Sequence, residues 1–296
     1  MQPVFLNYSQ AELDDCYDQR VWAKDAAGAV ARLGSASVTA RDATAHVADI
    51  AYGPGSDERL DWFRAKRADA PIHVHVHGGA WRNLAKEDAS FAAPAFVAAG
   101  IHHVVPHFSK LPGVRLPDVV EQVATALGWV YRNAHRHRGD PGRILLSGHS
   151  SGAHVAAVLL TLDWAARGLP ADLVKAALCV GGLYDLGPVM LSARRDYVTL
   201  SEAEVAALSP ARHVAAIRCP VTLVHGGRES PEFQRQTAEF AAKLAQAGKL
   251  AGSIAMPDAD HFEINEAFAV PASPVHRAAL DAVAAMGDGQ RTSSAA

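Results

Sequence analysis

Short apolar runs along the chain alternate with longer stretches in which apolar residues recur every three to four positions. The runs that predict strands are 71–76, 102–106, 144–146, 175–180, 221–224 and 250–256. The stretches that predict helices are 86–99, 118–135, 153–162, 231–247 and 264–286. Strands that alternate with helices of this length predict an α/β fold, with a mostly parallel twisted sheet and helices on both faces.

The pattern is less regular towards the N-terminus. Alternating β-branched residues at 36–40 and 45–51 predict an antiparallel pair at a sheet edge. Residues 8–24 are polar and helix-compatible, with Asn7 or Ser9 as the candidate cap. This N-terminal helix either lies on the surface or folds over the entrance to a site, and the sequence leaves both open.

Neither an internal repeat nor a linker divides the chain, so residues 1–286 are predicted to form one domain. The charged stretch 57–70 predicts a connection. The segment 187–214 is inserted between two predicted strands and is the best candidate for a small cap over the sheet. Residues 287–296 offer almost nothing to bury and are predicted to be a disordered tail.

Composition narrows the class of protein. The 296 residues are 49% hydrophobic and 20% charged, and the net charge of -3 provides no basic face for nucleic acid. The apolar runs fall well short of the ~20 residues that a membrane-spanning helix needs. The first residues lack the basic-then-apolar pattern of a secretion signal, so we expect a cytoplasmic protein. The three cysteines are widely spaced and form neither a disulfide framework nor a zinc spacing, and the strand-like surroundings of Cys179 and Cys219 favour buried, inert thiols there.

A glycine-flanked serine lies at the centre of the strand and helix pattern. Within 143–154, RILLSGHSSGAH, an apolar run ends at Ser150 between Gly148 and Gly152, and a helical stretch follows at 153–162. A serine at a sharp turn between strand and helix has an exposed hydroxyl, and glycines two residues before and after let the two elements pass closely. Ser150 is therefore the candidate nucleophile.

A serine hydroxyl needs a base to take its proton and a carboxylate to orient that base. Downstream of Ser150, Glu229 and His261 each follow the end of a separate predicted strand, in the serine, acid, histidine order of an α/β-hydrolase sheet. The competing carboxylates are Asp185, Asp258 and Asp260. Glu229 is favoured over Asp258 and Asp260, because those two lie on the loop of the histidine itself. Asp185 stays a competitor, since some such enzymes take their acid from the preceding strand.

An oxyanion that forms during acyl transfer is stabilised by backbone N–H groups aimed at it. The segment 77–81, HGGAW, lies at the tip of a predicted strand, where glycines let the backbone approach a substrate. We expect the N–H groups of Gly78 and Gly79, together with that of Ser151, to form an oxyanion hole. Whether Ala80 contributes instead of one glycine stays open.

Histidines gather near these segments. His73, His75 and His77 alternate along one strand face, a spacing that also suits metal ligands, but no neighbouring set of carboxylates and histidines completes a metal site. His154 lies one helical turn after Ser150 and is interpreted as a hydrogen-bonded core or supporting residue.

Four segments together give the chain a family resemblance: 77–81 HGGAW, 148–154 GHSSGAH, 226–236 GGRESPEFQRQ and 258–264 DADHFEI. With these segments the chain resembles the α/β-hydrolase superfamily over nearly its whole length. Within that superfamily it is most similar to the group of kynurenine formamidases, also called arylformamidases, and small carboxylesterases.

Members of that group hydrolyse N-formylkynurenine, or aryl and short-acyl esters, without a cofactor. The resemblance implies that Ser150 is the nucleophile, Glu229 the acid and His261 the base, with neither cofactor nor metal. Trp81 is expected to wall the acyl pocket and Tyr184 to contact the substrate, although a core position for either aromatic residue stays open.

The sequence thus predicts a serine hydrolase that cleaves an aryl formamide or a short-acyl or aryl ester through an acyl-enzyme. A carboxylesterase without formamidase activity is the alternative within the same mechanism, and a non-catalytic binding module on the same fold is the alternative outside it. The expected partner is a small ester or amide, without nucleic acid or membrane. The oligomeric state stays open, with a homodimer as one outcome.

Overall fold

An eight-stranded sheet organises the computed structural model, which describes residues 3–287. The strand order is β1-β2-β4-β3-β5-β6-β7-β8. The strands are β1 His46–Ala51, β2 Arg59–Phe63, β3 Ala70–Val76, β4 His102–Pro106, β5 Gly139–His149, β6 Ala176–Val180, β7 Val221–Gly226 and β8 Leu250–Met256. Neighbours from β4 to β8 pair in parallel, whereas β2 is antiparallel to both β1 and β4. The predicted fold class is confirmed.

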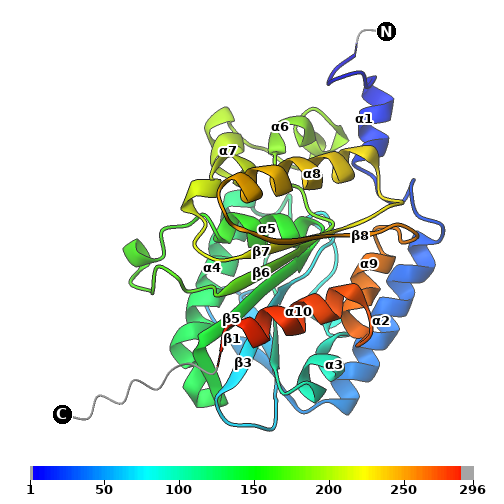
Figure 1. Ribbon diagram of the computed structural model, residues 1–296. Helices are drawn as coiled ribbons and strands as arrows, with labels where there is room; N and C mark the ends of the chain where they lie inside the picture. Colours follow the sequence, from blue (N-terminus) through cyan, green and yellow to red (C-terminus); the bar gives the residue numbers. More distant parts are fainter. Residues whose placement is uncertain (1–2, 288–296) are drawn as a thin grey trace.

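Helices cover both faces of this sheet (Figure 1). The α-helices are α1 Gln10–Cys16, α2 Ala26–Ala43, α3 Ala93–Ala98, α4 Leu116–Asn133, α5 Ser151–Leu159, α6 Leu186–Val189, α7 Glu202–Ala207, α8 Pro231–Gln246, α9 Glu263–Glu266 and α10 Pro274–Ala285. The 3-10 helices are η1 Lys86–Ala89, η2 Ala134–His137, η3 Ala165–Arg167, η4 Ala193–Asp196, η5 Pro210–Arg212, η6 Val214–Ala216 and η7 Ala267–Ala269. Helices α4, α5 and α8 contribute to the larger hydrophobic core, whereas α2, α3 and α10 contribute to the core on the other face.

The N-terminal third contains two differences from the predicted elements. The predicted strand 36–40 is wrong, because these residues belong to α2. Ala29, Leu33, Ser37 and Ala40 are its buried positions, spaced three or four residues apart, so the alanine-rich helix outweighs the local β-branched residues. The predicted strand at 45–51 is present as β1, but its antiparallel partner is β2.

Strand β2 lies inside 57–70, which was predicted to be a connection, and this prediction is wrong. Its charged residue Asp61 is fully buried, in ion pairs with Arg41 and Lys86. Lys86 Nζ lies 3.1 Å from an Asp61 carboxylate oxygen and is itself 2% exposed. Because each buried charge has a partner, the strand can enter the core despite its polar sequence.

Prolines interrupt two of the predicted helices. The stretch 264–286 divides into α9, η7 and α10, and α10 begins at Pro274 with the Ser273 hydroxyl accepting from the His276 N–H. The stretch 86–99 divides into η1 and α3, and Pro94 lies in the first turn of α3. Proline is tolerated in a first helical turn but not in a helix interior, which explains both breaks.

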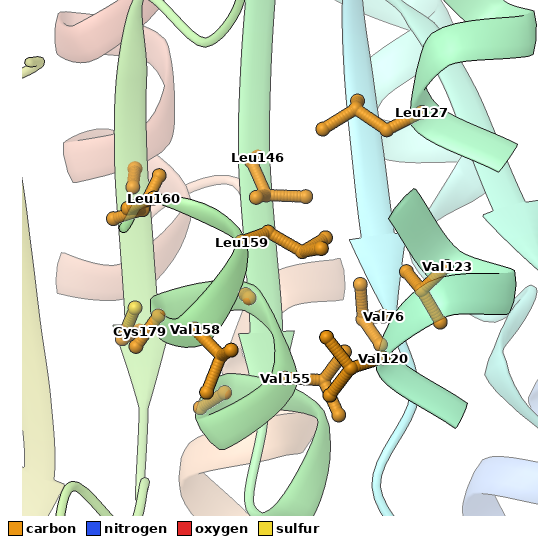
Figure 2. Packing of buried hydrophobic residues seen from close by; sticks show 14 of the residues in the cluster. Val76, Val120, Val123, Leu127, Leu146, Val155, Val158, Leu159, Leu160 and Cys179 are labelled. Atoms are coloured by element: carbon orange, nitrogen blue, oxygen red, sulfur yellow. The ribbon is translucent and has the colours of Figure 1, made fainter. Parts of the chain in front are cut away.

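The core beneath the site is formed by β5, α5 and α4 (Figure 2). Leu146 on β5 and Leu159 on α5 are fully buried, and Val123 and Leu127 of α4 pack beside them. Burying one such side chain contributes about 1.5–3 kcal/mol relative to leaving it exposed. This packing holds the carboxyl end of β5 and the first turn of α5 in a fixed relation.

Two further expectations concern thiols and membranes. Cys179 and Cys219 are buried and free, as their strand-like surroundings predicted, and Cys16 is buried and free as well. Within residues 3–287, helices of the length and apolar character needed to cross a membrane are not found.

Candidate active site

Ser150 lies at the turn between β5 and α5, with φ 57° and ψ -124°. This is a strained conformation for a residue with a side chain. A Cβ on Gly148 would lie 2.7 Å from the Ala153 nitrogen, and one on Gly152 would lie 2.7 Å from the Val76 carbonyl carbon. Both distances are too short for real atoms, so the two glycines permit the close crossing that presents the Ser150 hydroxyl.

The side chains of Ser150, His261 and Glu229 form one hydrogen-bonded chain. His261 Nε2 lies 2.9 Å from Ser150 Oγ, and His261 Nδ1 lies 2.5 Å from Glu229 Oε1. Glu229 follows β7 and His261 follows β8, so both loops start at the carboxyl edge of the sheet, where β5 also ends. The other Glu229 oxygen accepts from the Gly226 N–H at 2.8 Å.

Two of the competing carboxylates have other partners. Asp260 accepts from the N–H groups of Phe262 and Glu263, at 2.9 and 3.1 Å. Asp185 lies 2.9 Å from the Arg212 guanidinium. Glu229, by contrast, lies within hydrogen-bond distance of His261 Nδ1.

Burial determines the charges in this chain of side chains. Desolvation, followed by repulsion from Arg194, lowers the pKa of His261, so the imidazole is neutral at neutral pH and can accept a proton. Desolvation also raises the pKa of the Glu229 carboxyl, against the hydrogen bond from the Gly226 N–H. In its ionised form, Glu229 beside Nδ1 stabilises the charged imidazolium, which favours proton transfer from Ser150 to Nε2.

The loop after β3 lies against Ser150. A Cβ on Gly78 would lie 3.2 Å from the Ser150 Cβ, and Gly79 has φ 102°, a conformation that favours glycine. Ser151 is the first residue of α5, so its N–H has no acceptor within the helix. The Trp81 N–H donates to the Ser151 hydroxyl at 3.1 Å, which ties this loop to the start of the helix.

A cleft of about 900 Å³ opens onto Ser150 and His261. Its lining includes the N-terminal residues 14–33, the loop after β3, the segment 193–197 and the loop that carries His261. This volume lies in the range that is typical of small-molecule sites.

Comparisons with known proteins identify the family. The BD-FAE family matches residues 60–169. Kynurenine formamidase of Danio rerio is 30% identical over 80% of this chain and 82% of its own length. The chain belongs to the kynurenine formamidase family. Esterase LipQ of Mycobacterium tuberculosis is 31% identical over 73% of this chain and 57% of that protein.

Solved structures show the same fold. A protein of Silicibacter sp. has a TM-score of 0.79 at 24% identity, covering 89% of this chain and 97% of that one. The carboxylesterase EstE1, cloned from a metagenomic library, has a TM-score of 0.68 at 20% identity, covering 86% and 94%. The predicted resemblance to formamidases and carboxylesterases is confirmed by the two relatives above, and the protein is a hydrolase.

Gly181 is a site residue of this formamidase-family hydrolase that the sequence reasoning missed. It directly follows β6 and has φ 55°. A Cβ there would lie 2.7 Å from Glu229 Oε1 and 3.1 Å from His261 Nδ1. The signal was present in the sequence, as a Gly-Gly pair at the end of a strand beside the nucleophile strand, but it does not show which side chains the glycine faces.

The N-terminal residues take part in the site. Gln19 donates to the Ser230 hydroxyl at 2.8 Å and accepts from the Ser230 N–H at 3.1 Å, next to Glu229. The Tyr17 hydroxyl lies 3.0 Å from a Glu232 carboxylate oxygen on α8. Figure 1 shows α1 beside one end of α8. The helix predicted over 8–24 is shorter, α1, with Ser9 as its cap.

The two aromatic residues predicted to contact substrate lie deeper than expected. Tyr184 is fully buried and stacks on Phe240, with ring centroids 4.4 Å apart. Trp81 is 1% exposed and meets His154 edge-on at 5.2 Å. Neither is among the residues that line the cleft, so both take the core position that the sequence left open. His154 Nε2 lies 2.8 Å from the Leu208 carbonyl oxygen, as a hydrogen-bonded core residue.

The alternating histidines contact one another and a serine. His73 Nε2 and His75 Nδ1 lie 2.6 and 2.8 Å from the Ser147 hydroxyl, and His73 Nδ1 lies 3.1 Å from His103 Nδ1. His77 instead stacks on Phe108, at 4.3 Å. In the part of the chain that the structure describes, groups of three or more side chains with a metal-binding arrangement are not found.

Proposed function

We propose that this protein is a serine hydrolase that cleaves an aryl formamide, similar to N-formylkynurenine, or a short-acyl or aryl ester. The observation that carries this proposal is the hydrogen-bonded chain from Ser150 through His261 to Glu229, open to a cleft at its serine end. In this reaction Ser150 is the nucleophile, His261 the general base and Glu229 the residue that orients and stabilises the imidazolium.

The reaction proceeds through an acyl-enzyme. His261 Nε2 takes the Ser150 proton as Oγ attacks the carbonyl carbon, and the resulting oxyanion accepts hydrogen bonds from the N–H groups of Gly78, Gly79 and Ser151. His261 then returns the proton to the leaving amine or alcohol, and the formyl or acyl group stays on Oγ. Water, deprotonated by His261, releases the acid and restores Ser150.

Two substrate classes share this mechanism. The match to kynurenine formamidase supports the aryl formamide, whereas the match to esterase LipQ supports a carboxylesterase without formamidase activity. Comparison of kcat/KM for N-formylkynurenine and p-nitrophenyl acetate decides between them. If kcat/KM for N-formylkynurenine far exceeds that for p-nitrophenyl acetate, the protein is a formamidase. If only the ester is hydrolysed, it is a carboxylesterase without formamidase activity.

Replacement of the serine tests the chemistry. Ser150→Ala should lower kcat by at least ~10⁴-fold for either substrate, because its hydroxyl carries the acyl group. A fluorophosphonate should label the unmodified protein at Ser150 and leave this variant unlabelled, while Ser56→Ala, at an exposed loop position, should behave like the parent. Hydrolysis that survives in Ser150→Ala would overturn the proposal. If the unmodified protein is folded but hydrolyses neither substrate, the binding module is favoured instead.

We also propose that residues 1–286 form one domain, that 8–24 close one side of the cleft and that 187–214 act as a small cap. The hydrogen bonds of Gln19 to Ser230 and of Tyr17 to Glu232, together with the cleft lining by 193–197, support these assignments. Absence of nucleic-acid binding is proposed from the net charge of -3. Cytoplasmic location and a homodimer stay predictions, tested by cell fractionation and light scattering.

A further inference from the structure

Arg194 is a buried cation in the wall of the cleft. It lies on η4, in the segment proposed as a cap, and is 8% exposed. Its Nε and Nη2 both donate to the Tyr17 carbonyl oxygen, at 3.2 and 2.8 Å. Its Nη1 is buried and has no hydrogen-bond partner. One edge of the guanidinium is thus anchored, and the Nη1–Nη2 edge keeps unused N–H donors.

The neighbouring carboxylates are engaged elsewhere. Asp18 pairs with Arg20 at 2.5 Å, and Asp14 accepts from the Ala193 N–H at 2.6 Å. Within residues 3–287, ion pairs between Arg194 and a carboxylate are not found. The charge of Arg194 helps to lower the pKa of Asp18, but Asp18 pairs directly with Arg20. Because burying a cation without a directly paired carboxylate is costly, this side chain is poised to gain from an anion that enters the cleft.

Aromatic rings hold the guanidinium in place. Its Cζ lies 5.4 Å from the centre of the Trp81 ring and 5.9 Å from that of Tyr17. Trp81 belongs to the loop that packs against Ser150, and the charge of Arg194 contributes to the lowered pKa of His261. The cation is therefore electrostatically coupled to the reacting end of the cleft.

We propose that Arg194 is a specificity-determining residue that binds a carboxylate group of the substrate. The planar pair of N–H donors on its free edge matches the two oxygens of a carboxylate, and its single charge balances one negative charge. A phosphate dianion would need further donors or cations. The reaction is that of the proposed function, but the anion subsite can be tested without it.

Binding of product-like ligands tests the subsite independently of catalysis. Fluorescence titration compares 2-aminobenzoate with 2-aminobenzamide, which differ in charge but hardly in size. The unmodified protein and Ser150→Ala should bind the carboxylate at least about tenfold more tightly, as expected for charge-assisted hydrogen bonds. Equal affinity of the unmodified protein for both ligands would overturn the proposal, whatever the variants do.

Arg194→Gln should abolish this preference, and Arg194→Lys should retain part of it because the charge remains without the planar fork. The matched control is Arg82→Gln, which removes an exposed guanidinium that also lines the cleft and lies 4.2 Å from the Tyr197 ring centre. Its charge is screened by water, so the preference should change less than about threefold.

Turnover provides the second comparison. For 2-formamidobenzoate and 2-formamidobenzamide, Arg194→Gln should lower kcat/KM of the anionic substrate about tenfold or more, mainly through KM, and leave the neutral one within about threefold. An equal loss for both substrates would assign Arg194 to holding Tyr17 and refute anion recognition. If the carboxylate preference in binding is present and neither formamide nor ester is hydrolysed, the proposed function fails while the subsite stands.

Discussion

Gly181 provides a sharp test of the proposed site, because a single methyl group added there meets the acid and the base together. In Gly181→Ala the new Cβ would lie 2.7 Å from Glu229 Oε1, 3.0 Å from Ile264 Cδ1 and 3.1 Å from His261 Nδ1. None of these atoms is the end of a long flexible side chain that could swing into solvent, since Glu229 and His261 are 1% and 4% exposed.

The size of the effect follows from the displacement. The new Cβ would be closer to these atoms than non-bonded atoms normally approach. To restore an ordinary separation, Glu229 or His261 must move by about 0.5 Å. A misplacement of ~1 Å at a reacting centre costs about 10²-fold in rate, so half of it should cost about tenfold. We expect kcat of Gly181→Ala to fall about tenfold for ester and formamide alike, with KM little changed because the alanine does not face the cleft.

Backbone strain must be separated from this contact. Gly181 has φ 55°, a conformation that costs an alanine about 1–2 kcal/mol. Gly248→Ala is the matched control, because Gly248 has φ 68° and open space around the added Cβ. Both variants should lose similar stability in urea unfolding, and only Gly181→Ala should lose kcat and fluorophosphonate labelling rate. A folded Gly181→Ala with kcat within twofold of the parent would refute the reasoning.

Two predictions concern pH. Because burial lowers the pKa of His261, the fall of kcat/KM at acid pH should set in well below pH ~6.5, the ordinary pKa of histidine. A fall centred at pH ~6.5 or above, in protein shown by circular dichroism to be folded, would contradict this. Desolvation likewise lowers the pKa of His73, His75 and His103. Below pH ~6.5 the unfolded chain therefore binds protons that the folded protein does not. The free energy of unfolding should fall by up to ~1.4 kcal/mol for each histidine with every unit by which the pH is lowered. His103→Phe should reduce this slope, measured by urea unfolding between pH 5 and 8, by about one proton, and an unchanged slope would count against the buried neutral histidines.

Much of the candidate site is determined by local sequence. Ser150, Glu229 and His261 each follow an apolar strand, and parallel strands in one sheet end at the same edge, so their convergence could be predicted without knowing any contact. The same holds for Gly148 and Gly152, since a tight turn from strand to helix needs small residues at that spacing. In these cases secondary structure and chain order carry the information.

Tertiary structure decided what depends on contacts between distant segments. The strand β2 was hidden because Asp61 is paired with Arg41 and Lys86, and such pairing is not visible in hydrophobic periodicity. Likewise, only the folded chain places Gly181 against Glu229 and His261.

The N-terminal residues show most clearly that contacts between distant segments cannot be predicted from local sequence. From the sequence, residues 8–24 are interpreted as a surface helix, with a place at the site entrance as the alternative, because their polar side chains have few partners nearby in sequence. Folding brings the Tyr17 carbonyl to Arg194 and Gln19 to Ser230, across separations of 177 and 211 residues. The sequence alone determines where the reacting groups stand on the sheet, whereas the walls of the cleft, and the unpaired cation within them, exist only once distant segments have packed together.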